Sequence, residues 1–179
     1  MRIKALILSL VISVSFSLFA NEPLPTGYRN IKLGLSLDDT KLELIKTPEF
    51  GYRGDRDVSL IPGDNRILIE TSNPKNKLSY FTQCWFQFYQ EQLYTITLNI
   101  DTKKMDYYTM FTTLQTKYGE PETLDPQKAV WKNDDVTVML EKPLSIKYID
   151  NNITNQLANY STIQKSAEEN SRQMFLDDF

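Results

Sequence analysis

An uninterrupted apolar stretch opens the chain, running from Ala5 to Phe19 behind the basic residues Arg2 and Lys4. A basic start, an apolar stretch of about 15 residues and a small residue before a polar segment are typical of a secretory signal peptide. The stretch is shorter than the roughly 20 residues that a membrane-spanning helix needs. The pattern therefore predicts that residues 1–20 are a signal peptide cleaved after Ala20, and that the mature protein is periplasmic or secreted.

A helix is predicted after an extended lead-in over residues 21–35, which contain two prolines and two glycines. Ser36 can cap this helix, and Asp39 stands three positions later, as in a variant of the capping box. Leu44 and Ile45 would belong to its apolar side, and Thr47-Pro48 ends it. Residues 50–66 contain further glycines and a proline, which favour turns and a short hairpin.

Strand patterns dominate the rest of the chain. Strands are predicted over residues 66–71, 78–89, 93–100, 128–132, 136–141 and 144–150, rich in β-branched and aromatic residues. A helix over 103–118 would carry one apolar stripe made by Met105, Tyr108, Phe111, Leu114 and Tyr118. A C-terminal helix is predicted over 154–175, with Leu157, Tyr160 and Ile163 on one side.

These elements indicate an α+β fold in which helices pack on one face of an antiparallel sheet. The order of one helix followed by about three strands occurs twice, so two loosely repeated units are an alternative description. No residue-level repeat accompanies this order. We expect residues 36–179 to form a single α+β domain that ends in the long C-terminal helix.

The predicted strand around Trp85 carries large aromatic residues on both faces. A strand that is apolar on both sides is covered on both sides, so we expect the C-terminal helix or a bound partner to lie over Trp85 and Tyr89. Gln83 and Gln87 alternate with these aromatic residues. Aromatic area next to amide groups suits a peptide or a glycan, which makes this strand a candidate binding surface.

A second candidate binding surface is the turn that contains Arg53, Asp55, Arg56 and Asp57 between glycines. Glycines allow a ligand to approach the backbone, and interleaved arginine and aspartate side chains could bind a zwitterion, a sugar or a carboxylate. The alternative is a solvated turn whose ion pairs each contribute up to ~1 kcal/mol. Both interpretations remain open at the level of the sequence.

Composition argues against several kinds of chemistry. The chain has no histidine and one cysteine, Cys84, so catalytic triads with histidine and the commonest zinc sites are not expected. We expect no metal and no cofactor, and Cys84 is predicted to be a buried thiol. Paired carboxylates are the remaining route to hydrolysis, with Asp55, Asp57, Glu70 and Glu141 as candidates.

The formal net charge of −3 argues against nucleic-acid binding, which requires a clustered basic surface. Asn21 stands where a bacterial lipoprotein would have its lipid-bearing cysteine. We therefore expect neither a lipid anchor nor a membrane span in the mature chain.

Two short segments resemble small bacterial envelope proteins of the BamE/SmpA type. Residues 34–44 (GLSLDDTKLEL) are similar to the Leu-Gly-Met-Ser-x-x-Glu-Val helix opening of that family, and residues 117–121 (KYGEP) are similar to its helix ends. The resemblance implies a helix pair on a three-stranded antiparallel sheet and an accessory role in outer-membrane protein assembly. Because the family is lipid-anchored and this chain lacks the anchoring cysteine, the resemblance carries over only a scaffold type and an envelope setting.

The sequence thus favours a non-enzymatic periplasmic protein that binds another envelope component, either a protein or a glycan. The alternative is a small-ligand carrier with a cavity between sheet and helices, and the third hypothesis is a histidine-free hydrolase that uses carboxylates. A concave aromatic pocket at Trp85 and Tyr89 would favour the carrier, whereas a flat apolar patch there would favour a protein partner.

Overall fold

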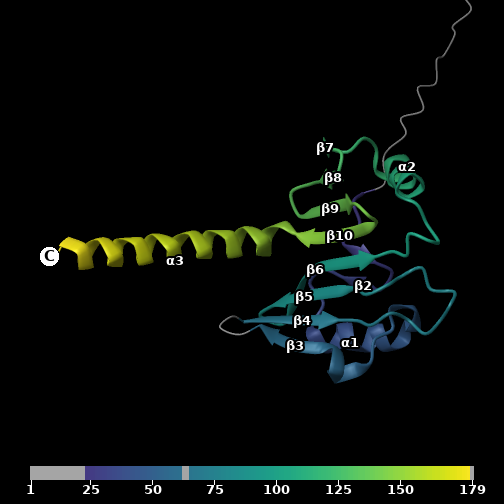
Figure 1. Cartoon of the computed structure of the whole chain (residues 1–179), viewed down its shortest axis with the longest axis horizontal. Coiled ribbons are helices and arrows are strands. Elements are labelled where there is room, and N and C mark those ends of the chain that lie inside the picture. The colour runs from purple at the N-terminus through teal and green to yellow at the C-terminus, as the bar shows by residue number, and fades with distance from the viewer. Residues whose placement is uncertain (1–22, 62–64, 178–179) are drawn as a thin grey trace, which may run out of the picture.

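The computed structural model describes residues 23–61 and 65–177, and this part of the chain forms an eight-stranded antiparallel sheet, a two-stranded hairpin and three α-helices (Figure 1). The predicted signal peptide and Asn21 lie outside the described residues. The α+β prediction is confirmed. The helices are α1 (Leu37–Lys46), α2 (Tyr107–Tyr118) and α3 (Asn151–Asp177), with the short 3-10 helices η1 (Pro48–Phe50) and η2 (Gly54–Asp57). The hairpin is β1 (Gly27–Tyr28) and β2 (Ile31–Lys32), within the predicted lead-in.

The large sheet has the strand order β3-β4-β5-β6-β10-β9-β8-β7. Its strands are β3 (Val58–Ile61), β4 (Arg66–Glu70), β5 (Trp85–Tyr89), β6 (Gln92–Asn99), β7 (Thr123–Leu124), β8 (Lys128–Lys132), β9 (Val136–Glu141) and β10 (Ser145–Asp150). One helix and four strands therefore occur twice, and the last strand of each unit, β6 or β10, pairs with the other at the centre. The sequence predicted about three strands per unit. The strands it did not define, β3 and β7, are edge strands and short.

Strand register separates the two faces of this sheet. Phe86, Ile96, Tyr148, Val138 and Trp131 are successive neighbours across β5, β6, β10, β9 and β8, so they share one face. Phe50 of η1 packs edge-on against Phe86, and Phe111 of α2 packs against Trp131. We call this side the helix face and the other side the opposite face.

Local capping determines where α1 begins. The Ser36 hydroxyl accepts a hydrogen bond from the Asp39 backbone N–H at 3.1 Å, which confirms the predicted N-cap. Thr40 and Leu44, four residues apart, are the buried positions of the helix, whereas Ile45 is 63% exposed. The expectation that Ile45 belongs to the apolar side is therefore wrong.

Helix α2 begins at Tyr107, later than predicted, because Asp106 caps it by accepting the Thr109 backbone N–H at 2.9 Å. With this start Tyr108 is 73% exposed and lies outside the buried stripe, contrary to the prediction. Tyr107 instead donates to the Leu140 carbonyl at 3.4 Å. At the other end the Trp131 indole donates to the Gly119 carbonyl at 2.8 Å, so both ends of α2 are tied to the outer strands β8 and β9.

The predicted strand 78–89 is regular only from Trp85 onward. Regular alternation along this strand would place Phe81 on the same face as Trp85, but Phe81 forms an isolated bridge with Ile100 and is buried in the core. Cys84 is fully buried, which confirms that prediction, and burial raises the pKa of its thiol to about 12. The thiol is therefore protonated at neutral pH.

The expected cover of Trp85 and Tyr89 by the C-terminal helix is wrong. Helix α3 continues directly from β10 and extends away from the sheet (Figure 1). Its first residue, Asn151, accepts from the Thr137 hydroxyl at 2.7 Å and donates to the Asn133 carbonyl at 2.8 Å. These buried bonds fix the direction in which the helix leaves, and Tyr160 and Ile163 are 62% and 67% exposed.

Candidate functional site

The residues predicted around Trp85 lie on the opposite face, where their polar atoms bind neighbouring residues. One carboxylate oxygen of Glu70 accepts both the Gln83 amide at 2.7 Å and the Trp85 indole at 2.9 Å. The Gln87 amide oxygen accepts the Tyr94 hydroxyl at 3.0 Å. Trp85, Gln87 and Tyr89 are half-buried on the exposed side of β5. The aromatic residues and amides therefore form a network within the sheet.

The Arg53–Asp57 turn is also organised by its own groups. The Asp57 carboxylate, almost fully buried, accepts the Arg53 backbone N–H at 2.7 Å and lies 3.6 Å from the Arg53 guanidinium. Asp55 is exposed and lies 3.5 Å from the Lys41 ammonium on α1, and Arg56 is exposed. Asp57 thus closes the turn through its contacts with Arg53, while Asp55 and Arg56 stay exposed.

The carboxylates considered for hydrolysis are engaged separately. Asp57 binds its own turn, Glu70 binds Trp85 and Gln83, and Glu141 pairs with Lys147. Within residues 23–61 and 65–177, no cluster of three or more acidic or cysteine side chains could hold a metal ion.

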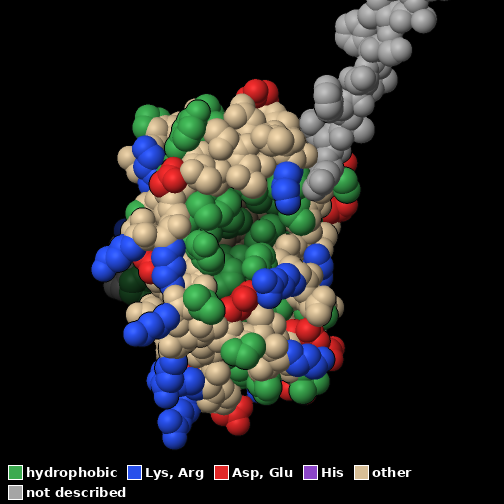
Figure 2. All heavy atoms as spheres, turned by 90° about the vertical axis from the view of Figure 1, so that its right-hand side faces the viewer, with side chains coloured by type: hydrophobic (Ala, Val, Ile, Leu, Met, Phe, Trp, Pro, Cys, Tyr) green, Lys and Arg blue, Asp and Glu red, His purple; other side chains and the backbone are tan. Residues whose placement is uncertain are grey.

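An apolar cleft of about 400 Å³ lies on the helix face. Figure 2 shows hydrophobic side chains lining a central hollow, with charged residues on its margin. The cleft is lined by Pro25, Gly27, Tyr28, Arg29, Tyr80, Phe81, Leu98, Ile100, Met105, Met110, Thr113, Leu114, Lys117, Tyr118, Ile146 and Tyr148. Neither Trp85 nor the Arg53–Asp57 turn belongs to this lining. We call this hollow the central cleft.

The central cleft exists because the two units cover the outer parts of the sheet better than its middle. Helix α2 is tied to β8 and β9, and the aromatic cluster of the first unit covers β5. The floor between them is formed by β6 and β10, through Leu98, Ile146 and Tyr148. Residues far apart in the sequence thus meet at the pairing of the two last strands.

The lead-in forms the wall that faces α2. The Tyr28 ring packs edge-on against Phe81 with a centroid distance of 5.2 Å, and its hydroxyl donates to Glu49 at 3.3 Å. Arg29 lies 3.0 Å from the same Glu49 carboxylate and above the Tyr28 ring. A side chain at Gly27 would collide with the Ile31 backbone, so the tight β1–β2 hairpin needs glycine there. This hairpin holds Tyr28 against the cleft.

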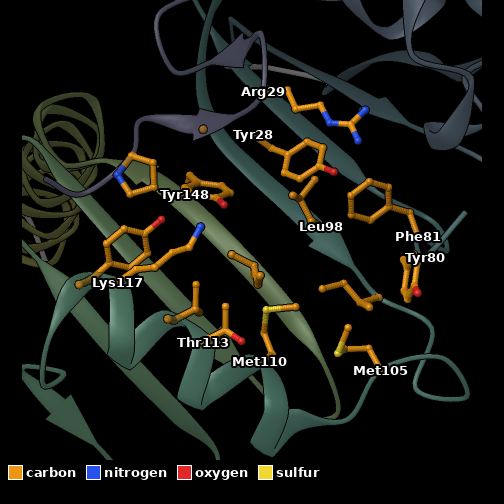
Figure 3. A pocket seen from close by; sticks show the side chains of 16 residues that line it. Tyr28, Arg29, Tyr80, Phe81, Leu98, Met105, Met110, Thr113, Lys117 and Tyr148 are labelled. Carbon is orange, nitrogen blue, oxygen red and sulfur yellow. The ribbon is translucent and has the colours of Figure 1, made fainter. Parts of the chain in front are cut away.

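One end of the cleft is polar. The side chain of Lys117, in the last turn of α2, points into the cleft toward the same end as Tyr148 (Figure 3). Burial, with smaller contributions from the phenols of Tyr118 and Tyr28, raises the pKa of Tyr148 far above its usual value. Tyr148 therefore keeps its proton at neutral pH and is available as a hydrogen-bond donor.

The other end of the cleft is mostly apolar, with Arg29 and the phenols of Tyr28 and Tyr80 at its margin (Figure 3). Met105, Met110, Phe81 and Leu98 lie at a distance from Lys117 along the cleft (Figure 3). Methionine side chains are flexible and polarisable, so they can adapt to apolar ligands of different shapes. The helical periodicity predicted a packing stripe that contains Met105 and Tyr118, and it gave no signal of a binding role for Met110, Thr113 or Lys117. The sequence shows the alternation of apolar and polar residues in β6 and β10, but it does not show that these two strands pair at the centre of the sheet.

Comparisons with known proteins give one family. The sequence pattern of the TP0088 domain family matches residues 26–160, which include every lining residue of the central cleft except Pro25 and end inside α3. The match does not confirm the resemblance to the BamE/SmpA type. No curated protein and no solved structure shows a significant match to the chain. No helix in the described part of the chain is both long and apolar enough to cross a membrane.

Proposed function

The chain belongs to the TP0088 domain family, and we propose that it is a non-enzymatic exported protein that binds the apolar part of a small ligand in the central cleft. The observation that carries this proposal is the half-open apolar cleft of about 400 Å³ between the sheet and α2. Ligand sites are concave, mostly apolar hollows of about 300–1,000 Å³ with a few polar groups. Of the functions the sequence left open, the carrier with a cavity between sheet and helices fits this geometry best.

The physical basis is the apolar surface that the cleft presents to water. Burying apolar surface is favourable by roughly 25 cal/mol per Å², and a ligand chain in the cleft would cover partly exposed apolar side chains such as Met105 and Met110. Because Asp57, Glu70 and Glu141 are engaged in structural contacts, binding without chemistry is the simplest use of the site. The apolar stretch at residues 5–19 supports an envelope location.

Fluorescence of the apolar dye N-phenyl-1-naphthylamine tests the proposal. Thr113 and Thr116 are both exposed on α2 and both donate to the carbonyl four residues earlier, but only Thr113 lines the cleft. Thr113→Trp should fill the mouth and weaken dye binding about tenfold or more, because a bulky side chain would occupy the space of the ligand. Thr116→Trp should leave dye binding unchanged. Equal affinity in both variants, or no dye binding by the unmodified protein, would contradict the proposal.

A protein partner that docks on α3 is a second candidate function. Apolar side chains at Tyr160, Ile163 and Met174 are exposed on this projecting helix, which is unusual for a helix without a partner. A photo-reactive residue at Ile163 should cross-link an envelope protein, and one at Ser166 should do so less. Equal labelling from both positions would argue against a specific interface.

A further inference from the structure

We propose that the natural ligand of the central cleft is a single-chain anionic amphiphile, with its carboxylate or phosphate at Lys117 and its apolar chain extending toward Met105. This inference rests on the proposed function and adds the chemical class of the ligand. It is carried by the polarity of the cleft, which changes from one end to the other (Figure 3).

The charged end of the cleft offers one cation to an anion. Within the described chain, no hydrogen bond or ion pair joins the Lys117 ammonium to another residue, although its side chain points into the cleft. The other cation of the lining, Arg29, is already paired with Glu49 at 3.0 Å. The charges of Arg29 and Glu49 therefore balance each other, and Lys117 supplies the remaining positive charge of the cleft lining. An anionic group is the complement of this end.

Tyr148 adds a directional donor to the cleft. Its hydroxyl reaches the cleft from β10, and the ring is 6% exposed, so the donor is held on a rigid strand. A hydrogen bond from such a phenol to an anion is stronger than one to a neutral oxygen. A carboxylate or a phosphate can accept from both Tyr148 and Lys117, whereas an alcohol gains less from either group.

The apolar end explains why a chain is expected and not a compact anion. Beyond Lys117 the floor offers Leu98 and Ile146, and the far end is closed by Met105 and Phe81. These side chains have no polar group for a ligand. Each methylene that the floor buries contributes about 0.8 kcal/mol, which corresponds to roughly fourfold in affinity. Inorganic phosphate alone would leave this surface exposed to water.

Dye displacement with three ligands of equal chain length separates the headgroup from the chain. Dodecanoic acid and dodecyl phosphate should displace N-phenyl-1-naphthylamine at concentrations about tenfold lower than dodecanol, because only the first two carry the charge that Lys117 complements. Concentrations are kept below micelle formation. If the acid binds more tightly than the phosphate, the ligand is of the fatty-acid type, and the reverse order indicates a phosphorylated lipid.

Lys117→Gln tests the residue that carries the inference. It should weaken binding of the anions about tenfold and leave dodecanol and the dye unchanged. Lys165→Gln, at an exposed position of α3 outside the cleft, is the matched control and should change neither. Equal binding of alcohol and acid, unaffected by Lys117→Gln, would overturn the anionic headgroup while the apolar site stands. Failure of every probe to bind would overturn the proposed function itself.

Discussion

The two faces of the sheet differ in how their polar groups are used. On the opposite face Glu70 already binds Trp85 and Gln83, and Gln87 binds Tyr94. On the helix face the central cleft leaves apolar side chains open to solvent, and Lys117 points into it. The aromatic residues and amides along β5 therefore form a hydrogen-bonded network on the opposite face. The binding site lies where two structural units leave a gap between them.

The largest difference between the faces should appear in stability. Trp131 is buried, packs at a tilt against Phe111 and holds the end of α2 through Gly119, so Trp131→Ala should lower the free energy of unfolding by about 4 kcal/mol. Trp85→Ala, on the opposite face, should cost about 1–2 kcal/mol because the side chain is only half-buried. Urea unfolding of both variants measures this, and equal losses would show that the faces are not distinguished by packing.

Removal of the shared acceptor on the opposite face should have a smaller effect. Glu70→Ala leaves the Trp85 indole and the Gln83 amide to water, which should lower stability by about 1 kcal/mol. Dye binding to the central cleft should not change. A loss of dye binding in this variant would mean that the network around Trp85 belongs to the ligand site, and the separation of the two faces would fail.

The smallest expected effect concerns the cap of α2, the helix that forms a wall of the cleft. Hydrogen bonds from Thr109 lower the pKa of Asp106 below the ordinary aspartate value of about 3.9. A depressed folded pKa contributes stability that is present above that ordinary value and is lost as the pH falls through the folded pKa. Asp106→Asn keeps a cap without the charge, so unfolding curves of the two proteins should converge on acidification. A constant difference between pH 7 and 3 would contradict this.

The parts of the fold that depend on nearby residues could be predicted from the sequence. The start of α1 after Ser36 follows from a capping motif whose two residues, Ser36 and Asp39, are three positions apart. The burial of Cys84 follows from the apolar residues around it in the sequence. The features of the fold that were predicted wrongly depend on contacts between residues far apart in the sequence. The direction of α3 is set by bonds from Asn151 to Asn133 and Thr137, and its exposed side chains gave the same periodicity as a packed helix.

The central cleft could not be predicted for a related reason. Leu98 and Ile146 have the pattern of core positions in ordinary strands, and they are 1% and 6% exposed. Their pairing across the centre of the sheet, which makes them the floor of a cleft, follows only from the fold. In the sequence, Lys117 looks like an ordinary surface lysine in the last turn of a helix. Only the position of α2 over β8 and β9 turns its side chain toward the cleft.

Methionine methyl signals in an NMR titration with dodecanoic acid test the central claim most directly. Met105 and Met110 line the cleft, Met139 pairs with Lys147 on the opposite face, and Met174 lies on α3, so the chain carries its own controls. The account predicts that the Met105 and Met110 signals shift and saturate while those of Met139 and Met174 stay in place. Shifts at Met139 or Met174 with unchanged cleft signals would contradict it.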